Sequence, residues 1–159
     1  MAIDAFLKLD GFKGETTDDK HADEIGVLAW GFGISFIHDS SGPSGRGGRS
    51  EFGHLNITKT VDLASPKLYL ACAQGAPIEK AVLSLQTSSG SSKMDFLIIE
   101  MEDVHVTSIS PSGSGDMPME GLTLSYGTIK WEYAQIDPTS GSKKGSDTTG
   151  WNLRDKVKL

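Results

Sequence analysis

Two carboxylates on one predicted strand, Glu100 and Glu102, have the spacing of a general acid/base pair. Side chains two residues apart lie on the same face of a strand, so each carboxylate would raise the pKa of the other. Such a pair can transfer protons in a hydrolase. A solvated or interface-facing strand explains this cluster equally simply, and no G-x-S-x-G signature accompanies it. We therefore favour a structural role for both residues and predict that the protein is not an enzyme.

Metal-binding chemistry has little support in the sequence. The four histidines, His21, His38, His54 and His105, lie on different predicted elements and form no H-x-H or H-x-x-x-H pair. We interpret them as loop or sheet-surface residues; a metal site would require folding to gather His54, His105 and a carboxylate. The lone Cys72 cannot build a typical zinc site, and its apolar surroundings indicate a packed small hydrophobe rather than a nucleophile. We predict no metal and no cofactor.

A glycine-rich segment, residues 41–50, invites comparison with a phosphate-binding loop. The spacing G-x-x-x-x-G-K-[ST] is absent, and the segment leads to a strand rather than to the helix N-terminus that a phosphate cradle requires. Low hydrophobicity and high glycine content instead predict an exposed, mobile contact loop. The candidate contact residues in it are Ser41, Gly42, Arg46, Arg49 and Ser50.

Four aromatic residues, Trp30, Tyr126, Trp131 and Tyr133, are candidates for a carbohydrate-stacking platform. Their alternation within predicted strands favours core packing instead. A β-barrel module that binds a small ligand or glycan as a monomer remains the alternative function, and a hydrolase that uses Glu100 and Glu102 is a third.

The composition fits one all-β domain, residues 1–159, because 19 glycines and 37% apolar residues indicate many turns around one core. The net charge of −6 argues against nucleic acid or an anionic membrane surface as a partner. A single cysteine excludes an internal disulfide, so folding must succeed in a reducing compartment. We expect no Sec-type signal peptide, because Asp4 and Lys8 interrupt the first residues, and we expect no membrane insertion.

Period-two alternation predicts strands over residues 2–9, 24–37, 54–61, 79–87, 94–110 and 122–136. The second strand places large apolar side chains, Leu28 to Phe36, on one face, which we expect to be buried. Its opposite face carries Gly31, Gly33 and Ser35, which can accept the backbone of a neighbouring subunit. The apolar phase slips at residues 102–103 and 127–128, which indicates bulges or corners. Residues 137–150 read as a polar loop, and residues 151–159 as a short edge strand.

One helix stands alone among these strands, with Ser65 as its expected N-cap and Pro66 at its first position. Gly75 supplies the left-handed stop, and Pro77 prevents the helix from resuming. The sequence therefore predicts a mainly β fold, a two-sheet β-barrel or sandwich with one short α-helix on its flank.

The order of several segments resembles the Hcp family, the tube protein of bacterial type VI secretion. These segments extend from Phe6 to Trp151, so the resemblance covers nearly the whole chain; they are FLKLDGFKGETTD, IGVLAWGF, SPKL, DVHVTS, IKWEY and GWN. The short stretch after Trp151 resembles plain structural members of the family rather than those with a fused toxin.

The resemblance implies homohexameric rings that stack into a hollow tube and can carry small effector proteins in the lumen. It implies sheath and spike proteins as further partners, and secretion from the bacterial cytoplasm to the extracellular space or a target cell. It places residues 41–50 in an extended loop that reaches toward the next ring.

Overall fold

The computed structural model describes residues 2–42, 47–87 and 93–159, and within them twelve strands and one helix form. Residues 43–46, within the predicted loop over residues 41–50, and residues 88–92 lie outside the described residues. The strands are β1 (Ile3–Leu9), β2 (Ile25–Val27), β3 (Ala29–Gly31), β4 (Ile34–Asp39), β5 (Gly47–Phe52), β6 (Leu55–Thr60), β7 (Pro77–Thr87), β8 (Met94–Ser112), β9 (Met119–Ser125), β10 (Thr128–Ile136), β11 (Lys143–Asn152) and β12 (Val157–Lys158); the helix is α1 (Ser65–Gln74).

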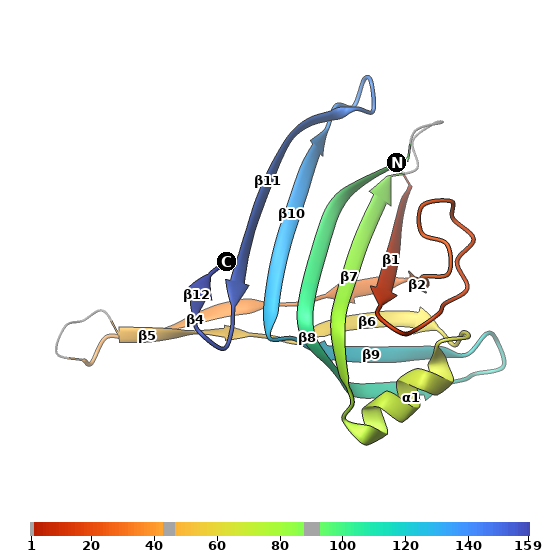
Figure 1. Ribbon diagram of the computed structural model, residues 1–159, viewed down its shortest axis with the longest axis horizontal. Helices are drawn as coiled ribbons and strands as arrows, with labels where there is room; N and C mark the ends of the chain where they lie inside the picture. Colours follow the sequence, from red (N-terminus) through yellow and green to blue (C-terminus); the bar gives the residue numbers. More distant parts are fainter. Residues whose placement is uncertain (1, 43–46, 88–92) are drawn as a thin grey trace.

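The strands form two crossed layers, with α1 beneath one end and the β4–β5 hairpin extending from the other (Figure 1). One layer has the antiparallel order β12-β11-β10-β8-β7-β1, and β2 pairs with the outer edge of β1. The second layer contains β3, β6, β9 and the last part of β8. This arrangement confirms the mainly β prediction in its sandwich form.

Strand β8 joins the layers because it bends. Its first part, up to Glu102, pairs with β10, whereas residues from His105 onward pair with β9. Asp103, at the bend, has a positive φ of 54°. Opposite it the chain turns between β9 and β10, where the Gly127 N–H donates to the Glu102 carbonyl at 2.9 Å. The predicted phase slips at residues 102–103 and 127–128 are therefore the corner between the layers.

The core lies between the layers and consists of the inward-facing apolar residues of both. The side chains with less than 2% exposure include Leu7, Ile25, Leu55, Ile57, Leu83, Ile99, Met101, Leu122 and Leu124, and Leu68 of α1 joins them. Alternation along each strand delivers these residues to one face, as the sequence pattern predicts.

Helix α1 ends as predicted, with Gly75 at φ 62°, but its start differs. Ala64 is the N-cap residue and no side chain caps the helix. The Ser65 hydroxyl turns inward, where it donates to Glu120 Oε1 at 2.5 Å and accepts from the Asp62 backbone N–H at 2.9 Å. The prediction that Ser65 caps the helix was wrong, because a buried carboxylate competes for its hydroxyl.

That carboxylate belongs to a buried ionic cluster beneath α1, which the sequence pattern does not reveal. Lys59 is fully buried, and its Nζ lies 2.5 Å from Glu120 Oε1 and 3.0 Å from Asp62 Oδ1. Tyr69 donates to Glu120 Oε2 at 2.7 Å. Burial favours the neutral acid, but the hydrogen bonds from Lys59, Ser65 and Tyr69 outweigh it and lower the pKa of Glu120.

Two strand predictions need correction. The predicted strand over residues 24–37 is three strands, and its large side chains are not all buried, since Leu28, Ile34 and Phe36 are 62%, 48% and 53% exposed. The chain leaves the sandwich after Phe32, so no second layer covers Ile34 and Phe36. Leu28 lies between β2 and β3, where the buried side chains are those of the opposite phase, Ile25 and Val27. Residues 137–150 are not a loop throughout: Lys143–Asn152 forms β11, whose polar residues pair with β10 through the backbone.

Candidate assembly surface

The predicted contact loop forms part of a projecting hairpin. Strands β4 and β5 pair from Ile34↔Phe52 to Asp39↔Gly47 as a sheet of their own. Arg49 and Ser50 lie within β5, so the prediction of one mobile loop over residues 41–50 was wrong for this part. Ser41 is tied to Asp39 by backbone and hydroxyl hydrogen bonds at 3.0 and 2.5 Å, and Gly42 follows in a bend. Arg46 lies outside the described residues.

Backbone pairing with β4 makes β5 a strand although its sequence, GGRSEF, contains no apolar run, because a ladder needs no particular side chains. Gly48 has a specific role in it. A Cβ at Gly48 would lie 2.4 Å from the ring of Phe36 and 2.7 Å from the Ile37 carbonyl oxygen, so only glycine lets the ring lie across β5. The glycine that suggested a mobile loop instead accommodates an aromatic side chain.

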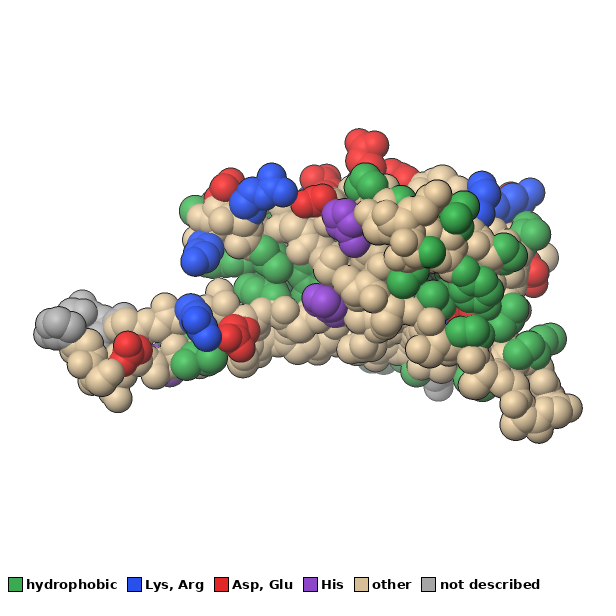
Figure 2. Space-filling view, turned by 90° about the horizontal axis from the view of Figure 1, so that it is seen from below, with side chains coloured by type: hydrophobic (Ala, Val, Ile, Leu, Met, Phe, Trp, Pro, Cys, Tyr) green, Lys and Arg blue, Asp and Glu red, His purple; other side chains and the backbone are tan. Residues whose placement is uncertain are grey.

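The hairpin exposes more large apolar surface than a two-stranded element needs. Ile34, Phe36 and Ile37 are each about half exposed, between 46% and 53%. Figure 2 shows hydrophobic side chains gathered where the hairpin leaves the body. A pocket of about 400 Å³ there is lined by residues of β4, β5 and β11 and of the turn after β11, including Phe36, Phe52, Trp151 and Lys156. Apolar surface of this kind marks a protein contact.

The small residues predicted to accept a neighbouring subunit lie at the base of the hairpin. Gly31 ends β3, Gly33 follows it and Ser35 is exposed in β4. Nothing lies within 4 Å of a Cβ built at Gly31 or Gly33. Gly33 is held by a 2.7 Å hydrogen bond from the Gly53 N–H to its carbonyl. The surface above these residues is open within the described chain, and their contact with a second subunit stays a prediction.

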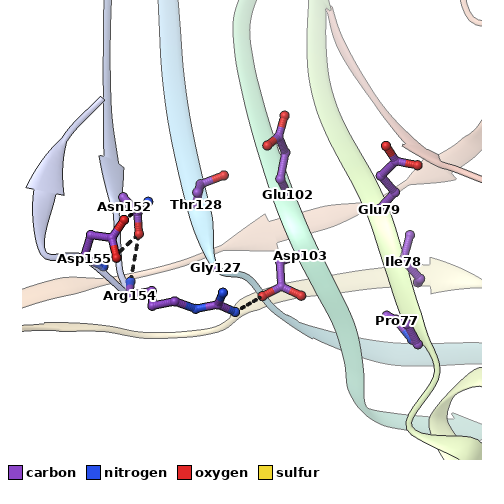
Figure 3. Close-up of a pocket in the computed structure, with 10 residues that line it drawn as sticks. All are labelled: Pro77, Ile78, Glu79, Glu102, Asp103, Gly127, Thr128, Asn152, Arg154 and Asp155. Atoms are coloured by element: carbon purple, nitrogen blue, oxygen red, sulfur yellow. Dashed lines mark hydrogen bonds and ion pairs between the residues drawn. The ribbon is translucent and has the colours of Figure 1, made fainter.

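The two carboxylates considered for acid/base catalysis have different surroundings. Glu100 lies 2.6 Å from Lys80 Nζ and 3.9 Å from Lys130 Nζ, and its hydrogen bond and charge raise the pKa of Lys80. Glu102 lines an open pocket of about 540 Å³ between Glu79 and Thr128, whereas Asp103 points to Arg154 at 3.1 Å (Figure 3). The ion pairs of Glu100 fit our interpretation that these carboxylates have a structural role.

The histidines do not gather. His54 meets Thr107 Oγ1 at 3.3 Å, and no group of three potential metal ligands occurs among residues 2–42, 47–87 and 93–159. His21, expected on the surface, is only 5% exposed. Its Nδ1 lies 2.7 Å from Glu24 Oε2 and its Nε2 lies 2.9 Å from Asp95 Oδ1. The surface prediction for His21 was therefore wrong, because the loop before β2 folds back over β1.

The ionisation of His21 follows from these contacts. Burial lowers the pKa of an imidazole, but Asp95 and Glu24 together outweigh this effect and raise the pKa of His21. The ring also stacks on Phe6 with centroids 4.4 Å apart. Because 74 residues separate His21 from Asp95, no local spacing in the sequence predicts that these two side chains meet.

Most of the aromatic candidates are packed rather than displayed. Tyr126 is buried, its hydroxyl donates to the Gly53 carbonyl at 2.6 Å, and burial raises its pKa to about 12. Trp30, Phe32 and Trp131 form a row with ring centroids 6.5 and 6.4 Å apart. Tyr133 differs, because it is 52% exposed. Cys72 is a partly buried free thiol packed against the core, in agreement with its interpretation as a small hydrophobe.

Comparisons with known proteins agree with this architecture. Residues 6–133 match the family model described as type VI secretion system effector, Hcp. Protein hcp1 of Pseudomonas aeruginosa is 36% identical over 161 residues, which cover 99% of each chain. The crystal structure of Hcp1 from Salmonella typhimurium has a TM-score of 0.79 at 32% identity and full coverage of both chains.

A second solved structure, that of a type six secretion system protein, has a TM-score of 0.89 at 32% identity, covering 99% of this chain and 100% of the other. No helix among the described residues has the length and apolarity needed to cross a bilayer. The family model spans most of the sequence and the full-length relatives share both its sequence and its fold, so the chain belongs to the Hcp family of the type VI secretion system.

Proposed function

We propose that this protein is a structural tube subunit whose copies form hexameric rings, and that these rings stack into a hollow tube. The observation that carries the proposal is the projecting β4–β5 hairpin, which exposes Ile34, Phe36 and Ile37 outside the sandwich. A lone protomer gains little from holding such a hairpin in water, since two-stranded hairpins are marginal by themselves. Contact with other copies of the chain would bury it.

Within this proposal each part of the surface has a role. The hairpin end, including Ser41, Gly42, Arg46, Arg49 and Ser50, contacts the next ring. Gly31, Gly33 and Ser35 lie against a neighbour in the same ring, where their size admits its backbone. The sheath and spike proteins of the machine are the other partners, and small effector proteins travel in the lumen. The tube leaves the bacterial cytoplasm for the extracellular space or a target cell.

Native mass measurement and electron microscopy of the purified protein test the ring. We expect a sixfold mass and annular particles, which lengthen into tubes as concentration rises. A protein that stays monomeric at high concentration contradicts the proposal and favours the monomeric ligand- or glycan-binding module. Stabilisation of that monomer by a glycan would support this alternative.

The stacking role is tested by replacing residues 40–46, which connect the paired Asp39 and Gly47, with a two-residue Asn-Gly turn, which suits a short hairpin. We expect rings of unchanged mass and a loss of tubes. The matched control shortens the exposed turn between β8 and β9, residues 113–116, and should form tubes as the unaltered protein does. Equal tube formation by the hairpin variant would refute the stacking assignment while leaving the ring intact.

A further inference from the structure

Opposite edges of the larger layer carry opposite charge. The loop that joins β1 to β2, residues 10–24, holds six acidic and two basic side chains besides His21. The segment from β11 to β12 and beyond, residues 143–159, holds five basic and two acidic side chains. We call residues 10–24 the acidic edge and residues 143–159 the basic edge. Strand order places them at the two ends of one layer, and Figure 1 shows them on opposite sides of the molecule.

The acidic edge is held in place by contacts within the protein. The buried His21 joins Glu24 of the loop to Asp95 of β8. Lys93 lies 2.7 Å from Asp18 Oδ2, and this hydrogen bond lowers the pKa of Asp18 to about 2. Asp10 and Glu15 are exposed and form no ion pair with another described residue. The loop therefore presents unpaired negative charge on a rigid support.

The basic edge has the complementary properties. Lys143, Lys144 and Lys158 are exposed, and none of them forms an ion pair with another described residue. Strand β12 covers only Trp151 and Asn152 of β11, so the outer side of β11 from Lys143 to Thr149 is an open sheet edge among the described residues. An open edge invites contact with another chain.

Both edges also expose apolar side chains beside their charges. Ile3, on β1 next to the acidic loop, is 53% exposed. Val157 and Leu159 on the basic edge are 50% and 55% exposed. An apolar centre with a charged rim is the usual anatomy of a protein interface. Two different edges of one chain with opposite charge form a head-to-tail contact, which generates a ring when its rotation closes.

We propose that neighbouring subunits of the ring meet through these two edges, with the basic edge of each copy against the acidic edge of the next. The inference rests on the proposed ring and adds the partner surfaces within it. Electrostatic complementarity of this kind fixes the order and direction of association and suppresses contacts between like edges.

A charge-exchange experiment tests the inference. In the variant Asp10→Lys/Glu15→Lys/Asp19→Lys the acidic edge carries five basic and three acidic side chains, so both edges of this variant are basic. In the variant Lys143→Glu/Lys144→Glu/Lys158→Glu the basic edge carries five acidic and two basic side chains, so both edges of that variant are acidic. Neither variant should form rings by itself at moderate ionic strength, and the concentration needed for half-assembly should rise roughly tenfold or more. An equimolar mixture should restore hexamers that contain three copies of each variant, because unlike edges then meet all around the ring. Native mass spectrometry resolves this composition.

Salt and a matched variant complete the design. Raising the ionic strength to about 1 M should weaken the rings of the unaltered protein and relieve the repulsion in each variant, since the Debye length falls to about 3 Å. The matched control Asp116→Lys makes a charge change of the same sign as the acidic-edge variant, in the turn between β8 and β9 and away from both edges, and should leave ring assembly unchanged.

The outcomes separate the two proposals. Rings in the unaltered protein that persist in both single-edge variants overturn the edge assignment and leave the tube function standing. Single-edge variants that lose rings, with no recovery on mixing, also overturn the pairing of these edges. Absence of rings in the unaltered protein overturns the proposed function and this inference with it.

Discussion

The sandwich and the β4–β5 hairpin differ in which side chains they bury and which they expose. The sandwich buries even charged groups, since Lys59 and Glu120 lie at 0% and 2% exposure within bonding distance of each other. The hairpin leaves Ile34, Phe36 and Ile37 about half exposed. The sandwich therefore pairs these buried charges internally, whereas the hairpin has apolar surface that no other described part of the chain covers. This difference indicates that the sandwich supplies stability and the hairpin supplies contact.

The largest expected effect comes from breaking the buried cluster beneath α1. Lys59→Met leaves the Glu120 carboxylate buried without its ammonium partner, which should lower the free energy of unfolding by about 3–5 kcal/mol. Urea denaturation followed by circular dichroism measures this loss. The double variant Lys59→Met/Glu120→Leu should recover part of it, because the buried Glu120 charge is gone and only Asp62, which still accepts from the Ala64 N–H, has lost its ammonium partner. A single variant as stable as the unaltered protein would show that the cluster does not support the sandwich.

A smaller and pH-dependent effect is expected at His21. His21→Phe keeps a ring against Phe6 but removes two charged hydrogen bonds, which should cost about 1.5–3 kcal/mol near pH 6. Because the folded state raises the pKa of His21, its stabilising effect is complete below the unfolded value near 6.5 and is lost as the pH rises through the folded value.

The difference in unfolding free energy between His21→Phe and the unaltered protein should therefore shrink between pH 6 and pH 9. Denaturation curves at several pH values give this difference directly. The control His38→Phe alters an exposed hairpin histidine and should show no such trend. A constant difference across the range would mean that His21 is not held as an imidazolium.

The smallest effect on stability is expected in the hairpin. Phe36→Ala removes a half-exposed ring and should change the free energy of unfolding by less than about 1 kcal/mol. Assembly should respond far more strongly, because this ring lies in the surface assigned to contact. Sedimentation velocity measures assembly beside the denaturation curve. Leu124→Ala in the core of the sandwich should show the reverse balance, a loss of stability with little direct effect on assembly. A hairpin variant that loses stability but assembles normally would contradict the division of roles.

Local patterns predicted the parts of the fold that depend on neighbouring residues. Alternation in β1, β6 and β7 and the stop at Gly75 appear as expected, because a strand face and a helix end follow from residues a few positions apart. The phase slips at Asp103 and Gly127 also located the corner between the layers. The candidate contact segment was found by its composition, although its structure was misjudged.

Long-range contacts decided the rest. Alternation of apolar and small residues leads to burial only where a second layer covers the strand. The sequence of residues 28–36 does not show that this layer ends before β4. Strand β11 forms from polar residues because its backbone pairs with β10, and pairing does not depend on hydrophobicity. Lys59 and Glu120 are 61 residues apart, so no local pattern brings these two charges together, and they meet only inside the folded protein.

The sequence by itself determined a mainly β chain with one helix, its corners and its family, because these properties are written in local spacing and in the order of short segments. Only the tertiary structure decided that residues 10–24 and 143–159 lie on opposite edges of one layer, and that the hairpin stands outside the sandwich. The sequence lists charged and apolar residues, but only the folded structure determines which of them lie together on one surface and which way that surface faces. A surface that binds another copy of the chain is a property of that placement.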